Sequence, residues 1–401
     1  MNIPARLLKL LPVCLCCILL GCLTACGGGS GTTSSATPVA GTGTPMTSSG
    51  GAAATDVAPT APPHLGTQPC PAVVSEPSHW DPIVNTESGV NAVTSVTCAN
   101  LTSNDSLQAL VVSVYEGTGQ NADVYVFDNI TSPNPNQIFK LHNLYKGSAK
   151  ISAYNTLLTA EVDQGSSLNT GRSNANYQQD VFREFAWSAG AGTLVPVSFP
   201  GIFPNLTRYE AERDQQLVNQ GQLPLLSATQ VANNLASKLL NWSANAAATL
   251  VSGGNQHDKD AVVTVKSTSA GAGTLKVTMS RLEGNTNNGI WEVTVVTSAG
   301  LSITTPQNRD LLNGITTVTG TGNAFEGVIG KVKVLDHLYT SIGTADAKGA
   351  SGNGNTTFST SIAYTASFKG GAQEGLLVLY SYSNADGTIA GAVMLKELLN
   401  A

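Results

Sequence analysis

An apolar N-terminal stretch that ends in a cysteine is the feature that most constrains this chain. Two basic residues precede an apolar run over residues 10–20, and Thr24 and Ala25 are the small residues before Cys26. Positive charge, an apolar centre and small residues in this order are the arrangement of a secretory signal peptide. We therefore expect residues 1–25 to be a leader and the rest of the chain to fold outside the cytoplasm.

The tetrad Leu23-Thr24-Ala25-Cys26 closes this stretch and resembles the lipobox of bacterial lipoprotein precursors. In that family the cysteine is diacylated and becomes the first residue after cleavage. Two acyl chains anchor a protein stably, whereas one binds a bilayer only marginally. The resemblance implies lipidation of Cys26 and a protein anchored on the outer, extracytoplasmic face of the cell membrane. Cys22, which follows Leu19-Leu20-Gly21, is a poorer candidate for this modification.

A membrane-spanning helix is the alternative interpretation of the same stretch. A span needs about 20 apolar residues. The apolar segment runs only from Leu10 to Ala25 and contains Pro12 near its start. Its short length favours a lipoprotein signal peptide over a span.

The charge content restricts the partners of the chain. Charged residues make up 11% of the sequence, whereas about 25% is usual for soluble domains. The formal net charge is −6, and the Lys and Arg residues form no cluster. A nucleic-acid partner would need a basic patch for its phosphates, so we exclude nucleic acid and expect solvent-facing surfaces that are polar but uncharged.

The cysteines predict one disulfide. Five of the seven lie at or before residue 26, so Cys70 and Cys98 are the only thiols of the exported part. Two cysteines in an oxidising compartment are most simply paired. Two free buried thiols are the alternative.

Composition divides the exported chain further. Residues 26–75 consist largely of Gly, Ser, Thr, Ala and Pro and cannot bury enough apolar surface to fold, which predicts a disordered tether. Residues 76–204 contain short runs with alternating apolar positions, as in 110–115, separated by turn-forming clusters. We expect a β-rich domain there, either a meander or a sandwich.

Helical patterns occur only between residues 205 and 300. Thr207 and Glu210 have the spacing of a capping box, which predicts a helix over about 207–220. Val231, Leu235 and Leu239 form one apolar stripe in a second helix over about 228–241. Alternating strands follow up to residue 297, so this region is predicted to be a small α+β domain with an antiparallel sheet.

Residues 301–401 read as strands and turns throughout. Thr305-Pro306, Gly322-Asn323-Ala324, Phe325-Glu326, Asp336 and Asp386-Gly387 match, in order and spacing, features of the immunoglobulin-like domain of bacterial spore germination proteins. The region resembles that family, although His337 stands where a turn glycine is more usual. The resemblance implies an extracytoplasmic β-sandwich of cell-envelope or spore-coat lipoproteins, and it implies no catalytic or binding residues. The fold class predicted for the whole chain is therefore mainly β.

The sequence contains no recognisable catalytic constellation. The five histidines are scattered, without the spacing of metal ligands. The glycine pairs do not continue into a phosphate-binding loop. Glu210, Glu212 and Asp214 crowd together, but acidic residues are typical of the first turns of a helix. We predict no metal, no cofactor and no enzymatic activity.

Three aromatic residues are the best hint of a binding site. Phe182, Phe185 and Trp187, with Asp180 and Glu184 beside them, could stack on the faces of sugar rings. The alternative is a core role, because Phe185 and Trp187 share one face of a strand. The polar segment 163–180 could hold a metal ion but lacks the order of ligands in calcium loops.

The sequence predicts a membrane-anchored extracytoplasmic lipoprotein that acts as a non-catalytic binding or structural module of the cell envelope. A link to sporulation or germination enters only through the family resemblance. One alternative is a lipoprotein that binds cell-wall or environmental glycan. The other is an envelope hydrolase with an unrecognised site. The expected partners are the membrane, cell-wall glycan or another envelope protein.

Overall fold

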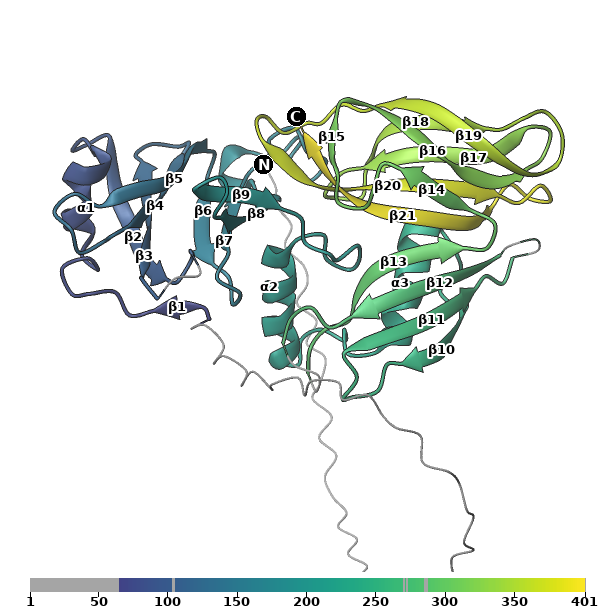
Figure 1. Cartoon of the computed structure of the whole chain (residues 1–401), viewed down its shortest axis with the longest axis horizontal. Coiled ribbons are helices and arrows are strands. Elements are labelled where there is room, and N and C mark those ends of the chain that lie inside the picture. The colour runs from purple at the N-terminus through teal and green to yellow at the C-terminus, as the bar shows by residue number, and fades with distance from the viewer. Residues whose placement is uncertain (1–64, 103–104, 270, 272, 285–287, 401) are drawn as a thin grey trace, which may run out of the picture. The chain divides into compact units, whose positions relative to one another are not determined.

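The computed structural model describes residues 65–400 except 103–104, 270, 272 and 285–287. These residues belong to one compact unit, Thr60–Ala401 (Figure 1). The signal peptide, Cys22, Cys26 and most of the predicted tether lie outside the described residues. None of the helices within the described part is long and apolar enough to cross a membrane.

The N-terminal region is a sandwich of two antiparallel sheets. The first has the order β1-β2-β3-β4-β5, and the second has the order β6-β7-β8-β9 (Figure 1). Leu110 and Val124 of the first sheet share one core with Leu157 and Phe185 of the second. The bounds are β1 Thr67–Gln68, β2 Asn91–Ala99, β3 Gln108–Tyr115, β4 Ala122–Asp128, β5 Asn136–Leu144, β6 Ser148–Ile151, β7 Leu157–Glu161, β8 Val181–Ser188 and β9 Thr193–Val197.

A helix and a disulfide cover the outer face of the first sheet. Helix α1, Pro77–Val84, packs on β2 and buries Trp80 against Phe127. The indole Nε1 of Trp80 donates a hydrogen bond of 2.7 Å to the carbonyl of Val74. Cys70 and Cys98 form a disulfide, with 5.3 Å between their Cα atoms. The cross-link ties the start of the described chain to β2.

The middle region contains two helices and four strands: α2 Arg208–Asn219, α3 Ala228–Leu240, β10 Ala247–Gly253, β11 Asp260–Lys266, β12 Thr274–Ser280 and β13 Glu292–Ser298. The stripe of Val231, Leu235 and Leu239 on α3 packs on inward-facing residues such as Val263 and Val277. Figure 1 shows α3 beside the strands β10–β13. Helix α2 contacts β7 and β8 instead. Its capping box is present, because Thr207 accepts a hydrogen bond from the amide of Glu210.

The C-terminal region is a second sandwich. One layer is β14-β16-β19, and the other contains β17, β18, β20 and β21. Val318, Phe358, Leu377 and Leu379 lie in the core between these layers. The bounds are β14 Ser302–Thr305, β15 Leu311–Asn313, β16 Ile315–Ala324, β17 Val328–Leu335, β18 Ser341–Lys348, β19 Gly354–Ala363, β20 Ala372–Tyr382 and β21 Ile389–Asn400. The prediction of a mainly β chain with a C-terminal sandwich is confirmed.

One sheet runs through both the middle and the C-terminal regions. Its order is β10-β11-β12-β13-β21-β20-β17-β18, and β15 pairs with β21 in parallel. The junction is the pairing of Val296 with Met394. Leu376 and Val378 of β20 face the core beneath α3. The middle region therefore completes its hydrophobic core with strands of the C-terminal sandwich.

Removal of the disulfide should lower stability without changing the fold. In the Cys70→Ala/Cys98→Ala double variant the unfolded chain regains the freedom of a 28-residue loop, and we expect a loss of about 3–4 kcal/mol in free energy of unfolding. Urea unfolding of the oxidised protein and the variant tests this. Reduced wild type should match the variant, and equal stabilities of the oxidised protein and the variant would contradict the prediction.

A buried carboxyl group makes the C-terminal sandwich sensitive to pH. Glu397 of β21 lies opposite Gly375 and on the same face as Leu399, whose side chain is in the sandwich core. Burial, reinforced by the charge of Asp310, raises the pKa of Glu397 to about 9. The native protein therefore holds this proton at neutral pH, whereas the unfolded chain releases it near the ordinary glutamate pKa.

The Glu397→Gln variant should lose this contribution. Between the ordinary glutamate pKa and about pH 9, the native state binds more protons than the unfolded state at this residue. Stability therefore falls as pH rises, by up to about 1.4 kcal/mol per pH unit. We expect a flatter dependence of stability on pH for Glu397→Gln between pH 5 and pH 9, measured by urea unfolding. Parallel curves for variant and wild type would refute the assignment.

Candidate functional site

The polar segment between β7 and β8, residues 162–180, is an ordered loop. The carboxylate of Asp180 accepts hydrogen bonds from the amide of Asp163, at 2.8 Å, and from the hydroxyl of Ser166. The buried side chain of Asn169 donates to the carbonyls of Asp163 and Gln178, at 3.0 and 2.9 Å. Two buried polar side chains, Asn169 and Asp180, therefore organise this loop, which we call the 162–180 loop.

The C-terminal sandwich contacts this loop through three side chains, one of which is Thr340, whose hydroxyl lies 3.5 Å from that of Ser167. The hydroxyl of Ser367 donates to Asp163, at 2.5 Å. The Nε2 atom of His337 lies 3.5 Å from a carboxylate oxygen of Asp180, and both side chains are buried. His337, which departs from the family pattern, thus lies against the N-terminal region.

Arg183 of β8 connects the N-terminal sandwich to the segment 367–372. Its guanidinium donates to the carbonyls of Ala372, at 2.8 Å, and Gly370, at 2.9 Å. The same group forms an ion pair with Glu161. Since hydrogen bonds of charged groups are stronger than neutral ones, Arg183 fixes the segment 367–372 beside the end of β7.

A groove lies between the 162–180 loop and the segment 367–372. It has a volume of about 580 Å³, within the usual range of small-molecule sites. Its lining combines apolar, aromatic, amide and charged side chains from four separate parts of the chain. These residues are Asn143, Tyr145, Glu161, Val162, Asp163, Gln164, Gly165, Val181, Ser367, Phe368 and Lys369.

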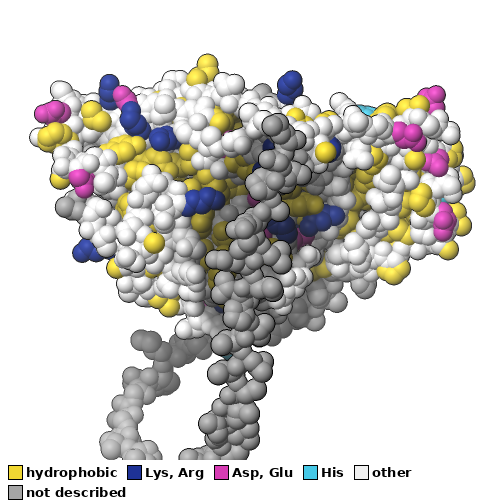
Figure 2. All heavy atoms as spheres, turned by 180° about the vertical axis from the view of Figure 1, so that it is seen from behind, with side chains coloured by type: hydrophobic (Ala, Val, Ile, Leu, Met, Phe, Trp, Pro, Cys, Tyr) yellow, Lys and Arg dark blue, Asp and Glu magenta, His cyan; other side chains and the backbone are white. Residues whose placement is uncertain are grey.

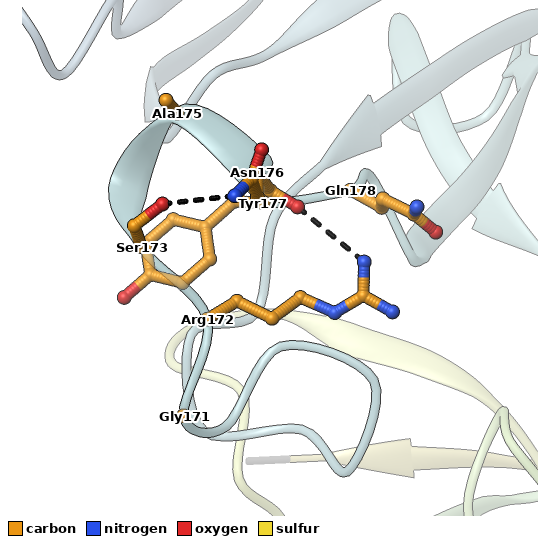
Figure 3. A pocket seen from close by; sticks show the side chains of 7 residues that line it. All are labelled: Gly171, Arg172, Ser173, Ala175, Asn176, Tyr177 and Gln178. Carbon is orange, nitrogen blue, oxygen red and sulfur yellow. Dashed lines mark hydrogen bonds between the residues drawn. The ribbon is translucent and has the colours of Figure 1, made fainter. Parts of the chain in front are cut away.

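A second hollow, of about 570 Å³, is formed by residues 171–178 alone (Figure 3). The side chain of Asn176 donates to Ser173, at 3.1 Å, and Arg172 donates to the carbonyl of Asn176, at 3.5 Å. Because one short segment supplies its whole lining, this hollow has no opposing wall from another part of the fold. The groove is the better candidate site.

The predicted strip of Phe182, Phe185 and Trp187 is wrong. Strand alternation puts Phe182 on one face of β8, where it stacks on Tyr209 of α2 with ring centroids 4.6 Å apart. Phe185 lies on the other face, 5.1 Å from the ring of Phe139, and Trp187 packs against the same core. Both faces of β8 are covered, so the three rings offer no common surface to a ligand.

The carboxylates beside that strip are also engaged. Glu184 and Glu283 both bind the guanidinium of Arg208, at 2.7 and 2.6 Å. Burial alone would lower the pKa of Arg208, but its interactions with the two carboxylates raise it. Burial raises the pKa of Glu283 to about 7. This network joins α2 to β8 and to the turn after β12.

The crowded acids at the start of α2 serve the helix and its neighbours. Glu210 accepts a hydrogen bond of 2.9 Å from Thr207, and burial raises its pKa. Glu212 pairs with Lys150 of β6, at 2.8 Å, and Asp214 pairs with the exposed Arg213. No group of three His, Cys, Asp or Glu side chains in the described ranges could hold a metal ion.

Sequence reasoning missed the residues that define the groove. Tyr145, Arg183 and Lys369 belong to no motif, and the hydrogen bond from Ser367 to Asp163 spans 204 positions. The density of Asn, Ser and Gln in 163–180 was the only local signal, and it indicates an ordered polar loop rather than a particular ligand.

Comparison with known proteins identifies one part of the chain. Residues 301–388 match the family model of the immunoglobulin-like domain of bacterial spore germination. The match covers β14 to the turn before β21, so the C-terminal sandwich is an immunoglobulin-like domain of this class. No curated protein matches the chain.

The chain is distantly similar to solved structures, of which one example follows. A protein of unknown function from Dyadobacter fermentans is 11% identical, with 77% of this chain and 98% of that chain covered, at a TM-score of 0.21. A score this low carries no argument about fold or function.

Arg183→Ala should loosen the wall of the groove. The variant loses the ion pair with Glu161 and both bonds to residues 370–372. With about 1.5–3 kcal/mol expected for a hydrogen bond to a charged group, amide hydrogen exchange over residues 367–372 should become about tenfold faster or more. Arg172→Ala, which removes one contact of 3.5 Å, is the matched control. Unchanged exchange in Arg183→Ala would show that this residue does not hold the wall.

Proposed function

We propose that this chain is a lipid-anchored extracytoplasmic protein that acts as a non-catalytic binding module of the cell envelope. The carrying observation is the combination of the Cys26 motif with a C-terminal domain of the spore germination class. A domain of that class supports a role in sporulation or germination. The disulfide supports an oxidising compartment, since disulfides are rare in the bacterial cytosol.

The side chains around the groove support binding rather than chemistry. A general acid or base needs a titratable group within reach of the proton it transfers. Glu161 is paired with Arg183, and Asp163 accepts from Ser367 and from the amide of Gly165, at 2.8 Å. These two carboxylates hold the walls of the groove in place.

The low charge content of the surface supports the proposal that the partner binds polar, uncharged groups. Figure 2 shows Lys, Arg, Asp and Glu side chains in small groups on a face that is otherwise mostly uncharged. With charged residues at only 11% of the chain, hydrogen bonding and shape would carry recognition. This pattern suits a partner of the outer envelope better than a polyanion.

Glycan binding is the second candidate function. The aromatic strip that first suggested it offers no common surface, because Phe182 and Phe185 are buried on opposite faces of β8. The groove supports glycan binding instead, because its lining joins two aromatic side chains to amides and charged groups. Ligand sites typically have such an apolar lining with a few placed polar groups.

Cys26→Ala should release the protein from the membrane. Wild type expressed in a bacterial host should sediment with membranes and carry a diacylated N-terminal peptide by mass spectrometry. The variant should stay unlipidated, because it lacks the thiol that takes up the chains. Cys22→Ala is the matched control and should remain anchored. A wild-type protein with an intact leader or a bare Cys26 would reject the proposed anchor.

A further inference from the structure

We propose that the groove between the 162–180 loop and the segment 367–372 binds an N-acetylated disaccharide that carries a carboxylate. This inference rests on the proposed function, because it names a ligand for the binding module, and it concerns the eleven lining residues of the groove. Four features of the lining select this chemistry: its engaged carboxylates, its unpaired donors, its aromatic wall and its single cation.

The carboxylates of the lining already have partners within the chain. Glu161 is neutralised by Arg183, whose guanidinium also holds two backbone carbonyls. Asp163 receives hydrogen bonds from Ser367 and Gly165. A metal ion or an amine would have to displace partners that are already in place, and the cost of unpairing buried charges opposes this.

The available polar groups of the groove are mainly donors. Lys369 and Gln164 are exposed and have no hydrogen-bond or ion-pair partner within the described part of the chain. The side-chain oxygen of Asn143 accepts a bond of 2.6 Å from Asn121, which leaves its amide hydrogens directed away from that bond. An ammonium group and amide hydrogens seek acceptors. The matching ligand is rich in acceptors, as are acetamido carbonyls, ring oxygens and carboxylates.

The apolar part of the lining suits the carbon-bound face of a sugar ring. Tyr145 is half-buried and is the aromatic side chain of the lining that offers surface to a ligand, whereas Val162, Val181 and Phe368 are buried. The hydroxyl of Tyr145 donates to Asn174, at 2.8 Å, and its ring contacts Tyr177 edge-on. These contacts fix the ring before any ligand arrives, which lowers the entropic cost of binding.

The single ammonium group of the lining sets the charge of the ligand. Lys369 is the one Lys or Arg among the eleven lining residues, and Arg183 beside the groove is already paired. A phosphate-rich ligand would need several cations or a nest of backbone amides. One ammonium group matches one carboxylate, which separates an acidic sugar from a neutral sugar.

Two disaccharides with the same backbone test the proposal. N-acetylglucosaminyl-N-acetylmuramic acid carries a lactyl carboxylate, which N,N′-diacetylchitobiose lacks. Titration calorimetry with the full mature chain in detergent should show the acidic disaccharide binding about twofold to fivefold more tightly than the neutral one, as expected for an ion pair with an exposed lysine. Lys369→Gln should abolish this preference and keep the weaker affinity for the neutral sugar.

Lys276→Gln is the matched control, because it removes an exposed lysine from β12, which supplies no residue to the groove. It should leave both affinities unchanged. Binding of neither disaccharide, an equal affinity for both, or a preference that survives Lys369→Gln would overturn the proposal. Membrane fractionation of the same proteins separates the two hypotheses: lost binding with Cys26 anchored rejects only the ligand, and binding by an unanchored protein rejects only the anchor.

Discussion

The hydrogen bonds and the ion pair of the buried Lys396 ammonium group are the interactions on which the packing of the segment 198–206 against the C-terminal sandwich depends. The ammonium group donates hydrogen bonds to the carbonyls of Gly201, at 2.9 Å, and Leu206, and it lies 3.5 Å from Glu374. Glu374 in turn accepts from the hydroxyl of Ser198, at 2.9 Å, and the amide of Phe199, at 2.7 Å. Strands β20 and β21 thereby hold the segment 198–206, which connects the N-terminal sandwich to α2.

Burial of the Lys396–Glu374 pair costs free energy, and removal of either partner also costs free energy. Burial lowers the pKa of Lys396 and raises the pKa of Glu374, while the attraction between the two groups opposes both shifts. A buried pair of this kind adds little net stability, but removal of one partner leaves a charge without compensation. Glu292 on β13 is a further buried carboxyl group that contacts the connecting segment. Burial raises its pKa to about 8, and it accepts from Asn205, at 3.0 Å. The connecting segment is therefore fixed by polar contacts from three strands of one sheet, β13, β20 and β21.

The sequence predicted several features that local chemistry determines, but it missed helix α1, Pro77–Val84, because helices were expected only between residues 205 and 300. The capping box of Thr207 and Glu210 and the stripe of α3 need only neighbours within four residues, and both are present in the structure. The sequence placed Phe185 and Trp187 on one face of a strand, but it could not show that Phe182 is also covered, because the burial of Phe182 depends on α2 packing against it. The groove could not be predicted from the sequence for the same reason, since its walls come from segments that only the folded chain brings together. The anchor at Cys26 stays a prediction, because it lies outside the described residues.

One long-range feature, the burial of both faces of β20, is indicated by the sequence. A sandwich strand with one face in water alternates apolar and polar side chains, whereas a strand buried on both faces reads as a continuous apolar run. Residues 376–380 are Leu-Leu-Val-Leu-Tyr. Leu377 and Leu379 fill the sandwich core, and Leu376, Val378 and Tyr380 fill the core beneath α3. This immunoglobulin-like domain therefore needs a covered outer face. Because β20 begins at Ala372, which accepts a hydrogen bond from Arg183, burial of this strand also positions one wall of the groove. Folding, rather than a ligand, thus sets the shape of the site.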